Sequence, residues 1–261
     1  MKNMKYLWSA GNRLKKIFLP EKTRLIFLDF DGTLVPIAPT PDAVCLDVKT
    51  KEVLSLLCSN RRIHLVIVSG RTLKELGAYL RFKNVILAGN HGLEVKGRGI
   101  QLPPKARQAR KLKHFINVLS QKFKIAFNGY PGVWVESKHF TLSIHFRNLP
   151  REQELFFREL VNFFKEKYRH YPILWTEGKK VMEVRPSVYW GKGDTVMYLL
   201  KKFNRAIPVA IGDDKADEDM FRVLKANDGT TIRVGHSKSS LADYYLTSPY
   251  DVRVFLQKLC T

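Results

Sequence analysis

Residues 25–34 read Leu-Ile-Phe-Leu-Asp-Phe-Asp-Gly-Thr-Leu, and this stretch decides the fold class. Its first four residues are apolar, and two aspartates and a glycine follow within the next four positions. An apolar run that ends at an acidic, glycine-containing loop is typical of a buried parallel strand. Two carboxylates beside such a glycine, Asp29 and Asp31, suggest a nucleophile and an acid.

The same acidic stretch could instead open a calcium-binding loop or form a capped turn. An EF-hand loop that began at Asp29 would need a glutamate at its twelfth position, where this chain has Thr40. We therefore favour the catalytic interpretation.

Three further apolar runs end at polar loops in the same way. They are residues 64–68 before Ser69-Gly70-Arg71, residues 85–88 before Gly89, and residues 209–211 before Gly212-Asp213-Asp214. Residues 46–58 and 72–81 have apolar side chains at helical spacing. Alternating strands and helices predict an α/β fold with a Rossmann-like parallel sheet, whose functional site lies at the carboxyl ends of the strands.

The second acidic segment, residues 212–219, has five acidic residues within seven positions. Like charges this close together need a cation or protons, and Mg²⁺ binds through a few carboxylates together with a substrate phosphate. An acidic helix N-terminus, stabilised by the helix dipole, would explain residues 217–219 but not Asp213 and Asp214 at a strand end. The segment therefore predicts a magnesium site.

Phosphate-binding candidates follow elsewhere in the chain. Ser69, Gly70 and Arg71 offer a hydroxyl, a flexible amide and a guanidinium where a helix is expected to begin. Lys192, just before a helix expected from Asp194, adds a cation that would hold phosphate and offset the charge of the nucleophile.

Residues 101–185 have a different pattern, which predicts a smaller α+β domain inserted into the first. The elements expected in it are a basic helix at 105–122, extended segments near 124–128, 133–137 and 141–146, a helix at 151–168, and strands near 173–176 and 181–185. The α/β core would then comprise residues 25–100 and 186–261. Residues 1–24 are expected to form a basic amphipathic N-terminal helix.

The chain is strongly basic, because 45 Lys and Arg against 24 Asp and Glu give a net charge of +21. No acidic residue lies between Glu94 and Glu136. This charge raises the alternative of a basic binding protein for nucleic acid or an anionic membrane, but no RNA-binding aromatic motif is visible. We expect no specific nucleic-acid partner. For the N-terminal helix, packing on the core and weak association with an anionic membrane are the two alternatives.

The expected location is the cytoplasm. No apolar run approaches the roughly 18 residues of a membrane span, and the N-terminal apolar run is too short for a signal peptide. The three cysteines are widely separated, without metal-type pairs, and are expected to be reduced. We expect the protein to be a monomer.

Four motifs occur in an order that resembles the haloacid-dehalogenase-like phosphatases: DFDGTL at 29–34, Ser69, Lys192 and Gly-Asp-Asp at 212–214. The resemblance implies a haloacid-dehalogenase-type core with an inserted α+β cap. It implies that Asp29 attacks phosphorus to form an aspartyl-phosphate, while Asp31 protonates the leaving oxygen and then activates water. Implied Mg²⁺ ligands are Asp29, the main-chain carbonyl of Asp31, and Asp213, supported by Asp214 or Asp217.

A closer resemblance, to the trehalose-6-phosphate phosphatase family, rests on four longer stretches. They are DFDGTLVPI at 29–37, AGNHG at 88–92, VESKHFTLSIHFR at 135–147 and GKKVMEVRP at 178–186. The resemblance implies that a further set of residues contacts the sugar: Glu136, Lys138 and Glu183, with Asn90, His91, Arg147 and Lys179 near the same cleft.

The resemblance implies a Mg²⁺-dependent phosphoric monoester hydrolase that converts trehalose 6-phosphate to trehalose and phosphate, the last step of trehalose biosynthesis. The alternative is another phosphosugar substrate, such as sucrose phosphate or mannosyl-glycerate phosphate. The chain departs from the family pattern at Phe30, where tyrosine is common, and at Ala216, where threonine or serine is usual. Neither departure removes a catalytic group.

Overall fold

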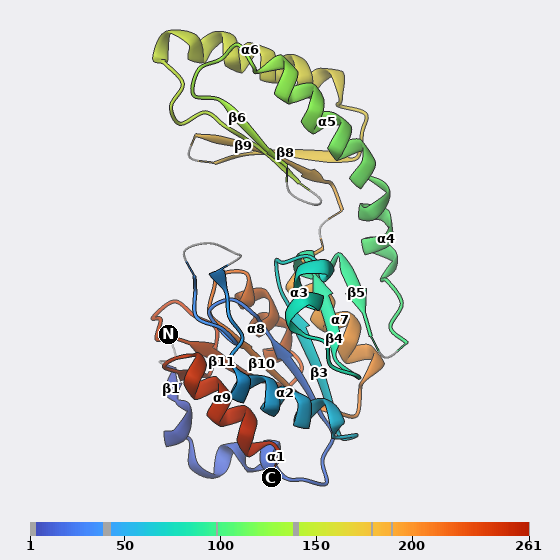
Figure 1. Ribbon diagram of the computed structural model, residues 1–261, viewed down its shortest axis with the longest axis vertical. Coiled ribbons are helices and arrows are strands. Elements are labelled where there is room, and N and C mark those ends of the chain that lie inside the picture. The colour runs from blue at the N-terminus through green and yellow to red at the C-terminus, as the bar shows by residue number, and fades with distance from the viewer. Residues whose placement is uncertain are drawn as a thin grey trace. The chain divides into compact units, whose positions relative to one another are not determined.

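The computed structural model describes residues 4–38, 43–97, 99–137, 141–178, 180–188 and 190–260. The chain divides into two units (Figure 1). The core unit comprises Met1–Leu102 and Trp190–Thr261, and the inserted unit comprises Pro103–Tyr189.

The core unit is built on an eight-stranded sheet in the order β1-β12-β11-β10-β2-β3-β4-β5. Neighbouring strands are parallel except for β4 and β5. This order places β2 in the middle of the sheet, between β10 and β3. The strands are β1 (Lys5–Tyr6), β2 (Arg24–Leu28), β3 (Ile63–Val68), β4 (Ile86–Gly89), β5 (Glu94–Lys96), β10 (Ile207–Gly212), β11 (Thr230–Val234) and β12 (Tyr244–Leu246).

Helices cover both faces of this sheet, which is why the central strands are mostly apolar (Figure 1). Along β2, Ile26 and Leu28 pack into one hydrophobic cluster, and Leu25 and Phe27 pack into a second. The helices of the first cluster are α2 (Val48–Ser59), α3 (Leu73–Tyr79) and α9 (Pro249–Lys258), and those of the second are α7 (Lys192–Lys202) and α8 (Asp217–Lys225). The predicted α/β fold with a parallel sheet is confirmed.

Three of these helices begin at side-chain caps. The Asp47 carboxylate accepts from the Thr50 amide at 3.0 Å at the start of α2. Thr72 and Glu75 form a capping box at the start of α3, and Ser248 caps α9. Each cap satisfies amide groups that the first helical turn leaves without partners, so it sets where the helix starts after its loop.

The N-terminal segment is not the single amphipathic helix that we expected over residues 1–24. Its described part holds β1, two 3-10 turns (Leu7–Ser9 and Gly11–Leu14) and the short helix α1 (Lys15–Phe18). Gly11 has a φ of +55°, in the left-handed region, which interrupts a continuous right-handed helix. Leu7, Leu14 and Ile17 are nevertheless buried in the first cluster, so the apolar side chains pack on the core.

The inserted unit has a four-stranded antiparallel sheet with helices on one face (Figure 1). Its elements are α4 (Pro104–Lys111), α5 (Lys113–Ala126), β6 (Trp134–Ser137), β7 (Leu142–His145), α6 (Arg151–Lys167), β8 (Ile173–Gly178) and β9 (Val181–Pro186), with the strands in the order β6-β7-β9-β8. Phe123 of α5 and Phe164 of α6 share a hydrophobic cluster with Met182 and Val184 of β9. Because side chains alternate along a strand, Glu183 lies on the face opposite the helices.

Residues 124–128, which we expected to be extended, instead complete α5 and the turn after it. Phe123 and Phe127 are both buried in the cluster of the inserted unit. Two residues four apart share one face of a helix, so both rings are buried by a helix here rather than by the expected extended segment.

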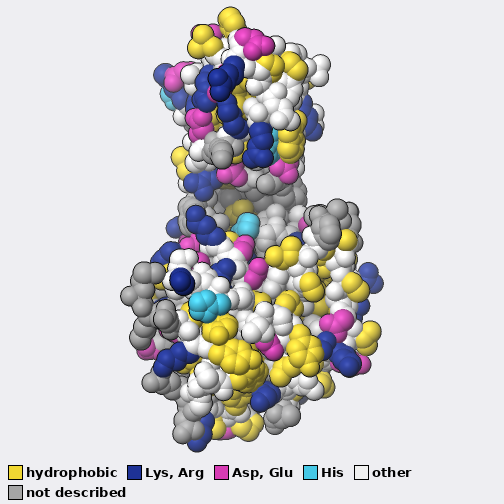
Figure 2. Space-filling view, turned by 90° about the vertical axis from the view of Figure 1, so that its left-hand side faces the viewer, with side chains coloured by type: hydrophobic (Ala, Val, Ile, Leu, Met, Phe, Trp, Pro, Cys, Tyr) yellow, Lys and Arg dark blue, Asp and Glu magenta, His cyan; other side chains and the backbone are white. Residues whose placement is uncertain are grey.

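Positive charge is not confined to one unit of the chain. On the face drawn in Figure 2, Lys and Arg side chains lie on both units, interspersed with acidic and hydrophobic side chains. Among the helices of the described residues, none is both long enough and apolar enough to cross a membrane.

The packing of the N-terminal segment leads to a stability prediction. Ile17 is fully buried, so Ile17→Ala should lower the free energy of unfolding by about 2–5 kcal/mol through lost burial and the resulting cavity. Thermal and urea unfolding would measure the loss. Leu19→Ala is the matched control, because Leu19 is 39% exposed and its loss should change stability little. Equal stability of both variants would contradict this packing.

Candidate active site

Two acidic residues lie at the carboxyl ends of neighbouring strands. Asp29 directly follows β2 and Asp213 directly follows β10, and these strands pair in parallel with Ile211 opposite Leu28. The Asp29 amide donates to the Ile211 carbonyl oxygen at 2.9 Å. The ladder therefore continues as far as Asp29 and brings both acidic groups to one edge of the sheet.

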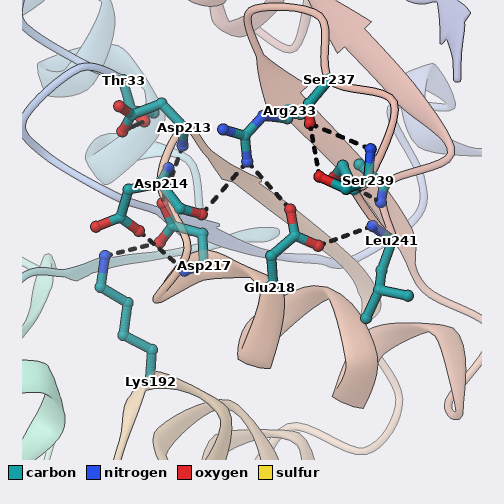
Figure 3. Close-up of polar contacts among 12 residues, drawn as sticks. Thr33, Lys192, Asp213, Asp214, Asp217, Glu218, Arg233, Ser237, Ser239 and Leu241 are labelled. Atoms are coloured by element: carbon teal, nitrogen blue, oxygen red, sulfur yellow. Dashed lines mark hydrogen bonds and ion pairs between the residues drawn. The ribbon is translucent and has the colours of Figure 1, made fainter.

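Lys192, the first residue of α7, places its ammonium group between the carboxylates of Asp29 and Asp217, and Figure 3 shows its contact with Asp217. Its Nζ donates to Asp29 Oδ1 and to Asp217 Oδ1, each at 2.7 Å. The three residues are almost inaccessible to solvent, with exposed fractions of 3% for Lys192, 4% for Asp29 and 0% for Asp217. Burial acts to lower the pKa of Lys192, but the charges of Asp29, Asp217 and Asp214 outweigh it and raise that pKa, so the lysine stays a cation.

Two glycines allow these carboxylates to come close. Gly32 has a φ of +78°, and a Cβ atom there would overlap the Asp213 carboxylate. A Cβ atom on Gly212 would overlap the Asp217 carboxylate. A larger residue at either position would therefore displace a carboxylate of the site.

The loop between β10 and α8 is folded around Asp217. The Asp217 Oδ2 atom accepts from the amides of Asp213 at 2.9 Å and Asp214 at 3.1 Å, and Asp214 Oδ1 accepts from the Asp217 amide at 3.0 Å. Thr33 Oγ1 donates to Asp213 Oδ1 at 3.3 Å. Burial acts to raise the pKa of Asp214, but the Lys192 charge and the hydrogen bonds outweigh it and lower that pKa. Asp217 therefore both pairs with Lys192 and shapes the loop.

The residues present fit a divalent metal ion. Carboxylate oxygens of Asp29, Asp213 and Asp217 all lie within 4.8 Å of one another. Burial is the main cause that raises the pKa of Asp29 to about 7 and that of Asp217 to about 8, and neighbouring carboxylates add to it. Burial also raises the pKa of Asp213. A bound divalent cation would favour the charged forms again, and carboxylate oxygens are the ligands that Mg²⁺ prefers.

Arg71, an expected phosphate-binding residue, is bound to the Asp31 carboxylate. Its Nε donates to Asp31 Oδ2 and its Nη2 to Asp31 Oδ1, each at 2.7 Å. Ser69, directly after β3, is buried, and its Oγ accepts from the Arg71 amide at 3.1 Å. A Cβ atom on Gly70 would lie 3.0 Å from the His91 ring. The Ser69–Arg71 loop therefore lies against both Asp31 and His91.

Asn90 and His91 form a tight turn after β4, with φ angles of +49° and +56°. The His91 amide donates to the Ser69 carbonyl oxygen at 2.8 Å. The Asn90 Nδ2 atom donates to Glu94 Oε2 at 3.0 Å. The turn thus joins the ends of β3 and β4, and the Asn90 side chain contacts Glu94 within it.

In the inserted unit, two expected sugar-binding residues share the sheet face opposite the helices. Glu136 of β6 lies opposite Ser143 of β7, and Ser143 lies opposite Glu183 of β9. Directly opposed residues of neighbouring strands point to the same face. Glu136 and Glu183 therefore flank Ser143 on one polar face.

The same face carries an aromatic pair. The Trp134 ring stacks on the His145 ring with centroids 3.8 Å apart, and His145 Nε2 is 3.1 Å from Glu136 Oε2. Arg147, two residues beyond β7, is exposed. The other expected sugar-binding residues, Lys138 and Lys179, lie outside the described residues.

One arginine at this site was not among the residues expected from the sequence. Arg233 of β11 donates through Nη1 to the Asp214 carbonyl oxygen at 3.3 Å and to Glu218 Oε1 at 3.0 Å (Figure 3). Glu218 Oε2 in turn accepts from the Leu241 amide at 2.7 Å. Arg233 thereby ties the Asp213–Asp217 loop to the next strand. The signal in the sequence was an arginine inside a β-branched run just before Gly235.

A family model described as trehalose-phosphatase matches residues 27–250. The chain belongs to the trehalose-phosphatase family. It is 32% identical to trehalose-phosphate phosphatase B of Arabidopsis thaliana, over 96% of this chain and 70% of that protein. It is 33% identical to trehalose 6-phosphate phosphatase RA3 of Zea mays, over 91% of this chain and 70% of that protein.

Solved structures agree with this membership of the trehalose-phosphatase family. A crystal form of Aspergillus fumigatus trehalose-6-phosphate phosphatase has a TM-score of 0.73 and 26% identity, and covers 98% of each chain. The C-terminal domain of the Candida albicans enzyme shares the fold, with a TM-score of 0.67 and 24% identity over 99% of this chain and 98% of that one. The chain therefore has a haloacid-dehalogenase-like phosphatase fold, and it is a phosphoric monoester hydrolase.

The raised pKa values predict how stability depends on pH in this trehalose-phosphatase family member. An aspartate whose folded pKa lies above its ordinary 3.8 binds more protons in the folded state, so the free energy of unfolding falls as pH rises through the interval up to about 7 or 8. We expect Tm in EDTA to fall from about pH 5 to about pH 8. Added Mg²⁺ should raise Tm more at the higher pH, where the carboxylates are charged.

Thermal unfolding of wild type and Asp217→Asn would check this pH dependence. The variant lacks one of the three carboxylates whose pKa is raised, so its Tm should vary less with pH. A wild-type Tm in EDTA that rises over this pH range would contradict the assignment.

Proposed function

We propose that the chain hydrolyses trehalose 6-phosphate to trehalose and inorganic phosphate, with Mg²⁺ and an aspartyl-phosphate intermediate on Asp29. The observation that carries the proposal is the buried contact of Asp29 with Lys192 beside further carboxylates, in a chain matched from residue 27 to 250 by the trehalose-phosphatase family. The maize and Aspergillus relatives are named for this substrate.

In the first step, an Asp29 carboxylate oxygen attacks the phosphorus and the bond between phosphorus and the sugar oxygen breaks. Asp31 gives its proton to that sugar oxygen, so trehalose leaves as a neutral alcohol. The Lys192 ammonium, 2.7 Å from Asp29 Oδ1, reduces the repulsion between the attacking carboxylate and the phosphate dianion. Ser69 and Lys192 bind phosphate oxygens in this proposal.

In the second step, Asp31 takes a proton from water, and the water oxygen attacks the phosphorus. The bond between phosphorus and the Asp29 oxygen breaks, so phosphate is released and the Asp29 carboxylate is restored. Asp31 is protonated again and the cycle is closed.

Mg²⁺ would be held by Asp29, the main-chain carbonyl of Asp31, and Asp213, with Asp214 and Asp217 supporting. When bound, the ion supplies positive charge to the phosphoryl oxygens, which is the main requirement of phosphoryl transfer. Asp217 contributes less directly, because its two oxygens already accept from Lys192 and from the loop amides.

The sugar hydroxyls are assigned to the polar face of the inserted unit. Glu136 and Glu183 offer carboxylate oxygens that accept from hydroxyl groups, and the stacked Trp134 and His145 rings offer an aromatic surface beside them. Lys138, Lys179, Arg147, Asn90 and His91 remain proposed contacts.

A substrate panel tests the activity. Wild-type protein with Mg²⁺ should release phosphate from trehalose 6-phosphate with a higher kcat/KM than from sucrose 6-phosphate or glucose 6-phosphate, and EDTA should abolish release. Asp29→Asn should reduce release to that of a protein-free blank, because the amide is not a nucleophile. Metal-dependent turnover that favours another sugar would refute the substrate, and full activity of Asp29→Asn would refute the nucleophile.

A second experiment tests the sugar contact of Glu183. Glu183→Gln should raise KM for trehalose 6-phosphate about tenfold or more, because a hydrogen bond to a charged group contributes about 1.5–3 kcal/mol. It should leave turnover of p-nitrophenyl phosphate unchanged, since that substrate has no sugar. Glu177→Gln is the matched control, because Glu177 lies opposite Met182 on the helix-covered face and pairs with Arg158. Equal effects of the two variants would exclude a specific role for Glu183.

A further inference from the structure

We infer that Arg71 positions the carboxyl group of Asp31 for its proton transfers, rather than binding the substrate phosphate. This inference rests on the proposed function, because that function assigns Asp31 the acid and base steps. It changes the role that the sequence suggested for Arg71.

The contact between the two side chains is a fork-to-fork pair. Arg71 directs Nε and Nη2 at the two different oxygens of Asp31, each at 2.7 Å. Two parallel hydrogen bonds from a planar guanidinium fix both the location and the rotation of a carboxyl group, which one bond would not. The two donors aimed at Asp31 are not aimed at a phosphate.

Arg71 is itself held in place. Its Cζ atom lies 5.4 Å from the centroid of the Phe30 ring and 5.8 Å from that of Tyr79, and its amide donates to Ser69 Oγ. The side chain of Arg71 is 10% exposed, whereas that of Asp31 is 39% exposed. The Arg71 side chain is therefore held in place by its surroundings, while the Asp31 carboxyl group is accessible to solvent and to an arriving substrate.

Orientation of this carboxyl group matters to the reaction. Asp31 lies in the loop after β2. The pairing of β2 with its neighbours β10 and β3 ends before Asp31, so it does not hold Asp31 in place. A carboxyl group free to rotate would spend less time aimed at the leaving oxygen, and proximity and orientation contribute much of an enzymatic rate. Arg71 gives up no atom and no proton in either step, so it acts only through Asp31.

A leaving-group series distinguishes the two roles for Arg71. Arg71→Met keeps a long apolar stem against the two rings but removes the fork. It should lower kcat/KM about 10- to 100-fold for trehalose 6-phosphate and for simple alkyl phosphates, whose leaving oxygens need a proton. It should lower kcat/KM less than about threefold for p-nitrophenyl phosphate, whose leaving group departs without one. We compare kcat/KM because this quantity depends only on the reaction steps up to and including departure of the leaving group.

The opposite result has a clear signature. If Arg71 binds phosphate, Arg71→Met lowers kcat/KM by the same factor for every substrate and weakens inhibition by inorganic phosphate. That pattern, or an unchanged kcat/KM for all substrates, would overturn the inference. Inhibition by inorganic phosphate that stays within about twofold of wild type supports it, together with the leaving-group dependence.

Two further variants guard against a general structural effect. Arg71→Lys keeps the charge but not the fork, so it should show the same leaving-group dependence, and it decides the question if Arg71→Met does not fold. Arg253→Met is the matched control, because Arg253 also pairs with an aspartate, Asp47 at 3.0 Å, and lies over a ring, Tyr250 at 4.8 Å. It should show no leaving-group dependence.

The series also separates failure of this inference from failure of the proposed function. Wild-type protein that hydrolyses aryl and alkyl phosphates but not trehalose 6-phosphate would refute the proposed substrate alone. The comparison of p-nitrophenyl phosphate with alkyl phosphates would still decide the role of Arg71.

Discussion

The Lys192 ammonium group donates to Asp29 and Asp217, which lie 163 and 25 residues away along the chain, and the rest of the core site is arranged around this contact. A buried ionic group is tolerated only when it is paired, and removal of one partner typically costs about 3–5 kcal/mol. The end of β2 and the first residues of α7 and α8 must therefore be in place together. The two glycines beside the carboxylates belong to the same constraint, since a side chain at either would push a carboxylate away from its position.

One ammonium group cannot balance the carboxylates of Asp29, Asp213 and Asp217. Burial raises the pKa of all three, so the site favours protons where no other cation is bound. Protonation would balance the charge but would disable Asp29 as the proposed nucleophile, because a neutral carboxylic acid does not attack phosphorus. A bound divalent cation would balance the charge and would keep Asp29 ionised. In the proposed mechanism, the charge imbalance that Lys192 leaves would therefore couple metal binding to the reactivity of Asp29.

The core fold could be predicted because β2, β3 and β10 are largely buried on both faces, which makes them mostly apolar and places polar loops at their carboxyl ends. Contacts between side chains could not be predicted in the same way. Spacing along the chain does not say where a long side chain points, so the pairing of Arg71 with Asp31 and the bridge made by Arg233 were not foreseen. The prediction of one helix over residues 1–24 is wrong because apolar residues at helical spacing can also be buried by successive short turns, once Gly11 interrupts the helix.

The net charge of +21 and the acidic site act on a phosphorylated sugar over different distances. Exposed Lys and Arg side chains are spread over the face drawn in Figure 2, and their attraction for an anion is screened beyond about 8 Å at physiological salt. At the proposed site the same anion would meet carboxylates, so attraction there would have to come from groups in direct contact with it, which in the proposed function are Lys192 and a bound cation. Buried pairs are screened much less than exposed ones. Added salt should therefore slow the encounter with the substrate while it leaves the chemistry at Asp29 largely unchanged.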